Sequence, residues 1–485
     1  MLASPRRSPW ITPRAACRLR NSAVGLSYCL LSPLVLAQGG TREAPAREFQ
    51  VATAAFKAGH YPEAARLLEA MVRKNPGSFP PNELLGLTYS AQAKKLDAVA
   101  QLRKAAKLAP QLPIGQVNLG IALIQEGEVD AAQAAFERAR TLDPQSFDAN
   151  HNLAAVELLK GQVSAAKPFL EAAHTARPDD DRTTYNLALA SMLTGHLREG
   201  KELTNSLLSK ADSSELHTLL GRINEKEGNF LPAADQFAMA AKVDPSEDNL
   251  FVWASEMLLH RTYEPAIQIF REGTRRYPNS PRLWVGLGMS LYSRGEYKDA
   301  IQALLQAARL DPKDPRCYLF LSKAYLSAPD QAQAVIDVFR RYAELEPRNA
   351  RAQYYYAMSL WKGRREQSGD IDYPAVEALL QKSVQLDGSN ADVHLQLGIL
   401  YNDMRAYEKC LPEYERALQL DPGLAEAHFR LGRFYLRAGE KEKSEVELAR
   451  FKTLQAEHQA EVDKERAEVQ QFVVTSGSSY SGRPE

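Results

Sequence analysis

The sequence is poor in cysteine and has no net charge, and each of these absences excludes a class of protein. Only four cysteines occur among 485 residues, and two of them, Cys17 and Cys29, lie near the N-terminus. The other two cannot build a zinc cage. Lysine plus arginine and aspartate plus glutamate each number 60, so the chain has no general electrostatic preference for nucleic acid or anionic lipid.

Sequence motifs for catalysis are also missing. There is no P-loop, no GxGxxG after a strand, no GxSxG elbow and no HExxH pattern. None of the histidines has the spacing of a metal ligand or of a catalytic group. We therefore expect a protein that is not an enzyme and that needs neither a cofactor nor a metal.

The first 37 residues differ in composition from the rest of the chain. They hold five arginines and no acidic residue, and an apolar run over residues 23–36 ends in Val35-Leu36-Ala37. Small residues at these positions suit a signal peptidase. We predict a signal peptide over residues 1–37, a linker over residues 38–44, and an exported (periplasmic or secreted) mature chain with a net charge of about −5.

Alternatives to this leader remain open. An arginine-rich segment without acidic residues also suits import into an organelle, and Leu26-Ser27-Tyr28-Cys29 resembles a lipoprotein cleavage box, although Tyr28 is bulky for that position. The apolar run is too short for a permanent anchor, and Pro33 interrupts it. We therefore expect no integral membrane segment in the mature chain.

Proline recurs along the chain with a period of about 34 residues. The series is Pro76, Pro110, Pro144, Pro178, Pro245, Pro278, Pro312, Pro347 and Pro422, with two double-length gaps. A fixed period of this size is typical of repeat architectures. The spacing predicts about twelve units over residues 45–456, with extra residues in a polar loop at 362–370.

Within one unit the apolar spacing is helical. In the unit that ends at Pro312, the first helix presents Trp284, Leu287, Gly288 and Leu291, and the second presents Ala300, Leu304 and Ala307. Small residues at the crossing point allow two antiparallel helices to approach closely. A glycine in the left-handed conformation is expected to end most first helices, namely Gly59, Gly127, Gly161, Gly195, Gly228, Gly295 and Gly439.

These residues resemble the tetratricopeptide repeat, whose pattern is Trp-x2-Leu-Gly-x2-Tyr, then Ala-x3-Phe, then Pro. The matching residues are Trp284-x2-Leu287-Gly288, Ala300-x3-Leu304 and Pro312, and similarly Leu119-Gly120, Ala132-x3-Phe136 and Pro144. Units 181–212 and 350–388 depart most from the pattern. The resemblance implies an all-α fold, a right-handed α-solenoid of about twelve hairpins with a concave groove lined by first helices.

The two ends of the array have expected roles as well. Residues 457–472 are charged and favour a helix, as expected of a C-terminal capping helix, and the tail at 473–485 has nothing to bury and is expected to be disordered.

Cys317 and Cys410 lie two repeats apart, too far for a disulfide.

Three asparagines recur at one position of three consecutive units. Asn118, Asn152 and Asn186 are 34 residues apart and precede the buried leucine of each first helix. A side-chain amide can pair with the backbone of an extended peptide whatever its sequence. The row is similar to the asparagine ladder in the superhelix of O-linked N-acetylglucosamine transferases, which implies peptide binding at the groove edge. Alternatively, the position tolerates a solvated or locally bonded polar residue.

Aromatic residues form a second candidate site. Tyr354, Tyr355 and Trp361 are expected to be exposed on the groove wall, and Tyr356 to be buried, because successive helical residues cannot all face inward. Exposed rings would anchor a partner. Alternatively, the rings pack between adjacent repeats.

The histidines have a simpler explanation. His217, His394 and His428 occupy the position of Trp284 in their units, which indicates packing between helices. The lysine and asparagine clamp with which some family members hold a C-terminal carboxylate is not reproduced.

The sequence as a whole predicts a non-catalytic scaffold that binds protein or peptide ligands in its groove, in cell-envelope or secretion assembly, without nucleic acid. No block outside the repeats is large enough for a catalytic domain. One alternative is an accessory subunit that presents substrates to a partner enzyme such as a glycosyltransferase, and another is a self-associating structural solenoid. The oligomeric state stays open.

Overall fold

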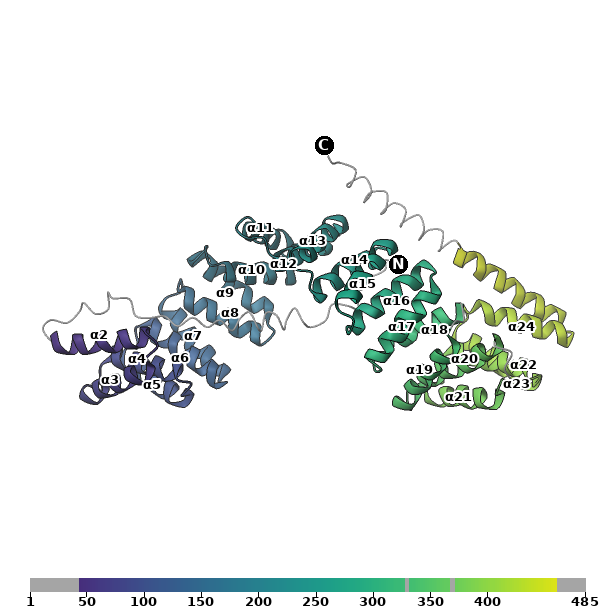
Figure 1. The fold of residues 1–485 in the computed structure, drawn as a ribbon, viewed down its shortest axis with the longest axis horizontal. Coiled ribbons are helices and arrows are strands. Elements are labelled where there is room, and N and C mark those ends of the chain that lie inside the picture. Colours follow the sequence, from purple (N-terminus) through teal and green to yellow (C-terminus); the bar gives the residue numbers. More distant parts are fainter. Residues whose placement is uncertain (1–42, 328–330, 367–370, 460–485) are drawn as a thin grey trace, which may run out of the picture. The chain divides into compact units, whose positions relative to one another are not determined.

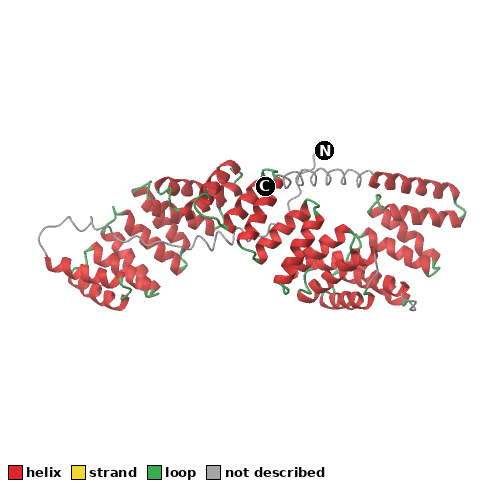
Figure 2. Cartoon of the chain, turned by 45° about the horizontal axis from the view of Figure 1, so that its top comes forward, coloured by secondary structure: helices red, strands yellow, loops and turns green. Residues whose placement is uncertain are grey.

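The computed structural model describes residues 43–327, 331–366 and 371–459, and these residues form helices joined by short turns, without a strand (Figures 1 and 2). The first helices of successive hairpins are α2 (Glu43–Lys57), α4 (Phe79–Ala91), α6 (Pro113–Glu126), α8 (Phe147–Leu159), α10 (Asp181–Leu193), α12 (Ser214–Lys226), α14 (Glu247–Leu259), α16 (Pro281–Arg294), α18 (Pro315–Ser327), α20 (Ala350–Glu366), α22 (Ala391–Asp403) and α24 (Ala425–Ala438).

Each first helix is followed by a second. These are α3 (Tyr61–Lys74), α5 (Lys95–Leu108), α7 (Val129–Leu142), α9 (Val163–Ala176), α11 (Leu197–Leu208), α13 (Phe230–Val243), α15 (Tyr263–Arg276), α17 (Tyr297–Leu310), α19 (Ala332–Leu345), α21 (Tyr373–Leu386), α23 (Tyr407–Leu420) and the helix at 441–459. The prediction of an all-α solenoid of about twelve hairpins is confirmed. The chain divides after Asn229 into two compact units, which we call unit 1 and unit 2.

The two helices of a hairpin meet at a small residue, as predicted. A β-carbon at Gly120 would lie 2.4 Å from the ring of Phe136 on the second helix, and one at Gly288 would lie 2.5 Å from Leu304. At such distances a side chain fits only if its neighbour moves, so glycine is the residue that fits these two positions without a shift. On α7 the buried residues Ala132, Ala135, Phe136 and Ala139 follow the i, i+3, i+4, i+7 spacing of a helix with one buried stripe.

The turn between the two helices depends on one left-handed residue. All seven glycines predicted to end first helices have φ between +76° and +96°. Ala93, Arg261 and Arg405 occupy the corresponding position of other units with φ of 57° to 60°. The turn keeps this geometry even where glycine is missing, although a side chain in the left-handed conformation is strained.

The residue at the fourth position of the repeat, where Trp284 stands, connects seven of the described first helices to the loop before them. Trp284 Nε1 donates to Pro278 O at 2.8 Å. Equivalent contacts reach the carbonyl six residues earlier from Asn82, Asn150, Tyr318, Gln353, His394 and His428. In these seven hairpins the contact satisfies a loop carbonyl and ties the first helix to the end of the preceding hairpin.

Several predicted boundaries are corrected by the structure. The predicted loop at 362–370 is helical up to Glu366, because α20 continues through lysine, arginine and glutamate, which favour helices. The first helix already begins at Glu43, inside the predicted linker. At the other end, one helix runs unbroken from 441 to 459, so the predicted boundary at 456 is not a break.

The remaining terminal predictions lie outside the described residues. These are the signal peptide at 1–37, most of the linker, residues 460–472 of the capping helix and the tail at 473–485. Among the helices that the structure describes, none combines the length and apolar character needed to cross a membrane.

Candidate functional site

The asparagine row lies on the side of each first helix that faces away from its own second helix. Asn118 precedes Gly120 by two residues, which is about 200° around a helix, and Gly120 faces Phe136 of the second helix. Asn118 Nδ2 instead donates to Glu83 Oε1 on α4, the first helix of the preceding hairpin, at 3.0 Å. The row therefore lies at the seams between consecutive hairpins of unit 1.

The predicted position at an open groove edge is corrected by this arrangement. Asn118, Asn152 and Asn186 are 0%, 2% and 3% exposed. The physical reason is the close packing of neighbouring hairpins. At the same repeat position of α16, a β-carbon on Gly286 would lie 2.3 Å from the ring of Phe270 on α15, which shows how little room this side of a first helix has.

The hydrogen bonds of the row are incomplete. Asn152 Nδ2 donates to Asp148 O in its own helix at 2.7 Å, which is the local bond that the alternative interpretation expects. The Oδ1 atoms of Asn152 and Asn186 are buried and accept no hydrogen bond from the residues that the structure describes. A buried acceptor without a donor is costly, and the packing that encloses these oxygens keeps them from contact with a ligand in this arrangement.

Glu83 is a polar residue of this seam that the sequence analysis missed. Its side chain is fully buried, and its Oε2 atom has no hydrogen-bond partner. Burial raises the pKa of this carboxyl from 4.5 to about 7, against the opposing effect of the bond from Asn118. The signal in the sequence was the only charged residue of α4, placed beside Leu84.

The predicted exposure of the aromatic cluster is wrong for two of its three members. Trp361 is fully buried and Tyr355 is 7% exposed, whereas Tyr354 and Tyr356 are half-buried. Trp361 belongs to the apolar cluster formed with Val376, Leu380 and other residues of α20 to α24, and packing in this cluster buries the ring.

The ring of Tyr355 packs within the fold as well. It lies 5.6 Å from Phe339 and 5.8 Å from Tyr354, measured between ring centroids. This is the packing between repeats that the alternative interpretation expects. Contact of Tyr354, Tyr355 or Trp361 with a partner stays a prediction. Tyr355 and Trp361 lack the exposure on which that prediction was based.

The histidines at the fourth repeat position bridge the two helices of a hairpin. His394 Nδ1 lies 2.6 Å from Glu413 Oε2 on α23, and His428 Nδ1 lies 2.5 Å from Glu447 Oε2 on the helix at 441–459. His217 differs, since its Nε2 lies 2.8 Å from Asp212 in the preceding loop.

The cysteines of the array are free thiols. Cys317 Sγ lies 3.0 Å from Asp314 O, and burial raises the pKa of Cys410 to about 11. Over the described parts of the chain, no group of three or more histidine, cysteine, aspartate or glutamate residues could hold a metal ion.

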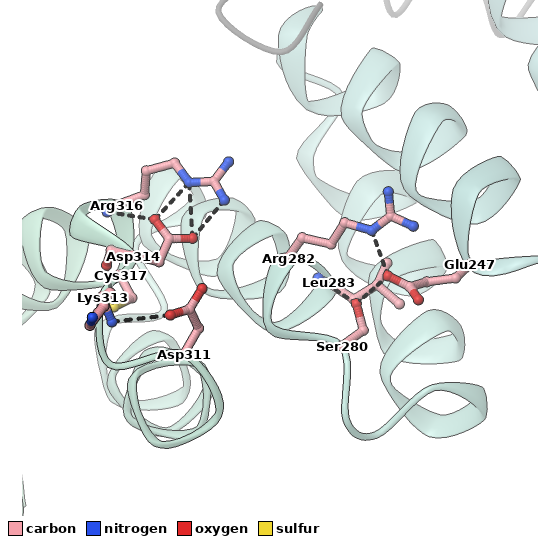
Figure 3. A network of polar contacts seen from close by, with 9 residues as sticks. All are labelled: Glu247, Ser280, Arg282, Leu283, Asp311, Lys313, Asp314, Arg316 and Cys317. Atoms are coloured by element: carbon pink, nitrogen blue, oxygen red, sulfur yellow. Dashed lines mark hydrogen bonds and ion pairs between the residues drawn. The ribbon is translucent and has the colours of Figure 1, made fainter. Parts of the chain in front are cut away.

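Arginines near the N-termini of α16 and α18 in unit 2 are held by carboxylates (Figure 3). Arg282 Nε donates to Glu247 Oε1 at 2.5 Å, and Ser280 Oγ donates to the same oxygen at 2.6 Å. The guanidinium of Arg316 donates through Nε and Nη2 to Asp314 at 2.6 to 3.0 Å. Both guanidinium groups are therefore already engaged within the protein.

The helix hairpins recur about every 34 residues. The two helices of a hairpin cross at a small residue, and a left-handed residue forms the turn between them. These features define a helical repeat protein of the α-solenoid class. Family models described as tetratricopeptide repeat match residues 50–113, 123–171, 157–223, 260–315, 294–349 and 377–450. The chain belongs to the tetratricopeptide repeat family, as its sequence motifs predicted. These repeats are generally non-catalytic, and the fold is typical of protein–protein interaction scaffolds.

Solved structures of several repeat proteins are similar to the chain. A structure of Naa15/Naa10 bound to HypK-THB is 19% identical, covers 84% of this chain and 68% of that chain, and has a TM-score of 0.39. YrrB, described as a TPR protein with an unusual peptide-binding site, is 17% identical over 38% of this chain and 96% of its own, with a TM-score of 0.36. MamA of Desulfovibrio magneticus RS-1 is 26% identical over 34% of this chain and 95% of its own, with a TM-score of 0.32. No curated protein matches the sequence.

Proposed function

We propose that the protein is a non-catalytic scaffold that binds extended segments of partner proteins along the asparagine row of unit 1. The observation that carries this proposal is the tetratricopeptide repeat fold, which is typical of protein–protein interaction scaffolds. The Oδ1 atoms of Asn152 and Asn186 have no hydrogen-bond partner among the described residues, but they are buried and would meet a ligand only when their side chains turn out of the seam. Backbone N–H groups of a peptide are the donors these oxygens lack. The peptide-binding site named for YrrB is consistent with this use of the fold.

The spacing of the row suits an extended chain. Packed helices lie about 8 to 10 Å apart, and an extended peptide rises about 3.3 Å per residue. One asparagine would therefore meet every third residue of the ligand, independently of its side chains. The predicted leader at 1–37 would deliver such a scaffold to the cell envelope or to a secretion assembly.

The test replaces Asn118, Asn152 and Asn186 by alanine together. Binding is measured by fluorescence anisotropy with labelled 12-residue peptides chosen from a peptide array probed with the full mature chain. We expect the affinity to fall more than tenfold, or about 1.4 kcal/mol, and the fold to persist by circular dichroism. Unchanged affinity would remove the row as the binding element.

The matched control removes three exposed amides from second helices, at Asn205, Gln268 and Gln302, and should leave the affinity unchanged.

Co-purification with a single enzyme from the native cells would instead favour the accessory-subunit alternative, and a mass that rises with concentration would favour self-association. N-terminal sequencing of the mature protein tests cleavage after Ala37.

A further inference from the structure

Helix α24, near the yellow end of the colour bar in Figure 1, is the first helix of the last hairpin that the structure describes. It carries three arginines on one face. Arg430, Arg433 and Arg437 are spaced i, i+3 and i+7, which places them within about two turns on the same side. Arg433 and Arg437 are exposed, and Arg430 is half-buried. The corresponding positions hold Asn118, Ile121 and Gln125 in α6 and Leu219, Arg222 and Lys226 in α12, so α24 differs from both in carrying three arginines there.

The guanidinium groups are held in place by rings. The guanidinium carbons of Arg430 and Arg433 lie 6.0 and 5.8 Å from the ring centroid of Phe429, whose ring is 5.1 Å from that of Phe451 on the helix at 441–459. A cation over a ring face is stabilised and loses side-chain freedom. Two of the three charges are therefore pre-positioned by the packing of the last hairpin.

The third arginine is positioned by the preceding hairpin. Arg437 Nη2 donates to Asn402 Oδ1 on α22 at 2.7 Å, and its guanidinium carbon lies 5.7 Å from the ring of Tyr407 on α23. Helices from two successive hairpins thus build one surface, which we call the arginine face (Phe429, Arg430, Arg433, Arg437).

The charge of this face is only partly balanced within the protein. Arg430 Nε donates to Glu426 Oε1 at 2.7 Å, in a pair in which both side chains are exposed to solvent. Arg433 and Arg437 form no ion pair with any residue that the structure describes. Exposed pairs such as Arg430 with Glu426 contribute little to stability, so a ligand carboxylate can replace Glu426 at low cost.

We propose that the arginine face binds an acidic extended segment of a partner protein through its aspartate or glutamate side chains. Guanidinium forks bind carboxylates in a bidentate manner. The face spans seven residues, or about 10 Å of helix, which matches a few residues of extended chain and is short for a nucleic acid backbone, which requires a longer basic stripe. This proposal uses other residues than the asparagine row and stands independently of it.

The test compares two labelled peptides, Gly-Glu-Ser-Glu-Glu-Ser-Glu-Gly and its analogue with glutamine at each glutamate. Fluorescence anisotropy with the full mature chain in 50 mM salt should show at least tenfold tighter binding of the glutamate peptide, and the difference should shrink at 500 mM salt. The double variant Arg433→Glu with Arg437→Glu should lose this preference and should favour the lysine analogue of the peptide.

Two controls separate the proposal from a general charge effect. The double variant Arg416→Glu with Arg450→Glu changes the same charge at exposed sites outside the face and should keep the preference. Arg433→Lys with Arg437→Lys keeps the charge but loses the fork, and should weaken glutamate-peptide binding three- to tenfold. The helix content of each variant is checked by circular dichroism.

Equal preference in wild type and the Arg433→Glu, Arg437→Glu variant would overturn the proposal, and so would equal losses in the Arg416, Arg450 control. Tighter binding of a 12-base-pair DNA duplex than of the glutamate peptide would point to phosphate recognition instead and also overturn it. The triple asparagine variant should retain glutamate-peptide binding, so failure of one proposal is distinguishable from failure of the other.

Discussion

Unit 1 and unit 2 use the same hairpin but place different chemistry at the seams between hairpins. At the sixth repeat position, α6, α8 and α10 of unit 1 carry Asn118, Asn152 and Asn186, whereas α16, α18 and α20 of unit 2 carry Gly286, Phe320 and Tyr355. In unit 1 the seam holds buried amides and the carboxyl of Glu83. In unit 2 it holds rings, with Phe320 5.9 Å from Tyr292.

The comparison teaches which positions the fold fixes and which it leaves to function. The glycine crossing and the left-handed turn occur in both units, so they belong to the hairpin itself. The sixth position varies from asparagine to tyrosine without changing the hairpin. Differences between the two units at the sixth position are therefore candidates for functional differences.

The largest expected effect concerns the apolar core of unit 2. Trp361→Ala removes a fully buried ring and should lower the free energy of unfolding by about 3 to 5 kcal/mol. The measurement is guanidinium unfolding followed by circular dichroism. Tyr356→Ala, which truncates a half-buried neighbour on the same helix, should cost less than half as much, and equal losses would contradict the burial of Trp361.

The polar seam of unit 1 should instead respond to pH. The pKa of Glu83 rises from 4.5 to about 7 in the folded chain, so the folded state holds the proton more tightly and wild-type stability falls as pH rises through this window. Glu83→Gln removes the ionisation. The variant should match wild type at pH 4.5 and be more stable by up to about 3 kcal/mol at pH 8.

Urea unfolding at the two pH values measures this difference. Glu215→Gln, at an exposed glutamate of α12, serves as the control and should behave as wild type at both. If the Glu83→Gln variant gains no stability at pH 8, the pKa of the Glu83 carboxyl is not raised in the folded chain, and the prediction is wrong.

The smallest effect tests how tightly the seam of unit 2 is closed. Gly286→Ala places a β-carbon 2.3 Å from the ring of Phe270, and the ring must move, at a cost of about 1 to 3 kcal/mol. Gly77→Ala, whose nearest contact would be 3.8 Å, should change the unfolding free energy little. If both variants are equally stable, the apolar seam has more room than the packing indicates.

The sequence predicted the hairpins well because their determinants are local and periodic. Proline spacing, the glycine crossing and the left-handed turn at residues such as Gly127 are each encoded within one unit. What it could not predict is which neighbour a side chain meets one hairpin away. Asn118 and Trp361 were therefore placed on the correct helices and given the wrong surroundings.

Two other features could not be predicted from the sequence for the same reason. The buried state of Glu83 depends on α6, 35 residues further along the chain, and Arg437 is positioned by Asn402, 35 residues before it. The i, i+3, i+7 spacing of Arg430, Arg433 and Arg437 was visible in the sequence, but its organisation around Phe429 required the contact with Phe451.

The bond from the fourth repeat position to the carbonyl six residues earlier makes the repeat tolerant of sequence drift. Asparagine, tryptophan, tyrosine, glutamine and histidine differ in size and shape, yet each reaches the same oxygen. In these hairpins the turn uses a hydrogen on nitrogen or oxygen at a given reach and no particular residue, and in α14 the hairpin forms with Leu250 at this position, whose side chain has no donor. A chain built in this way can lose most of its recognisable motif and still keep the pitch of its turns.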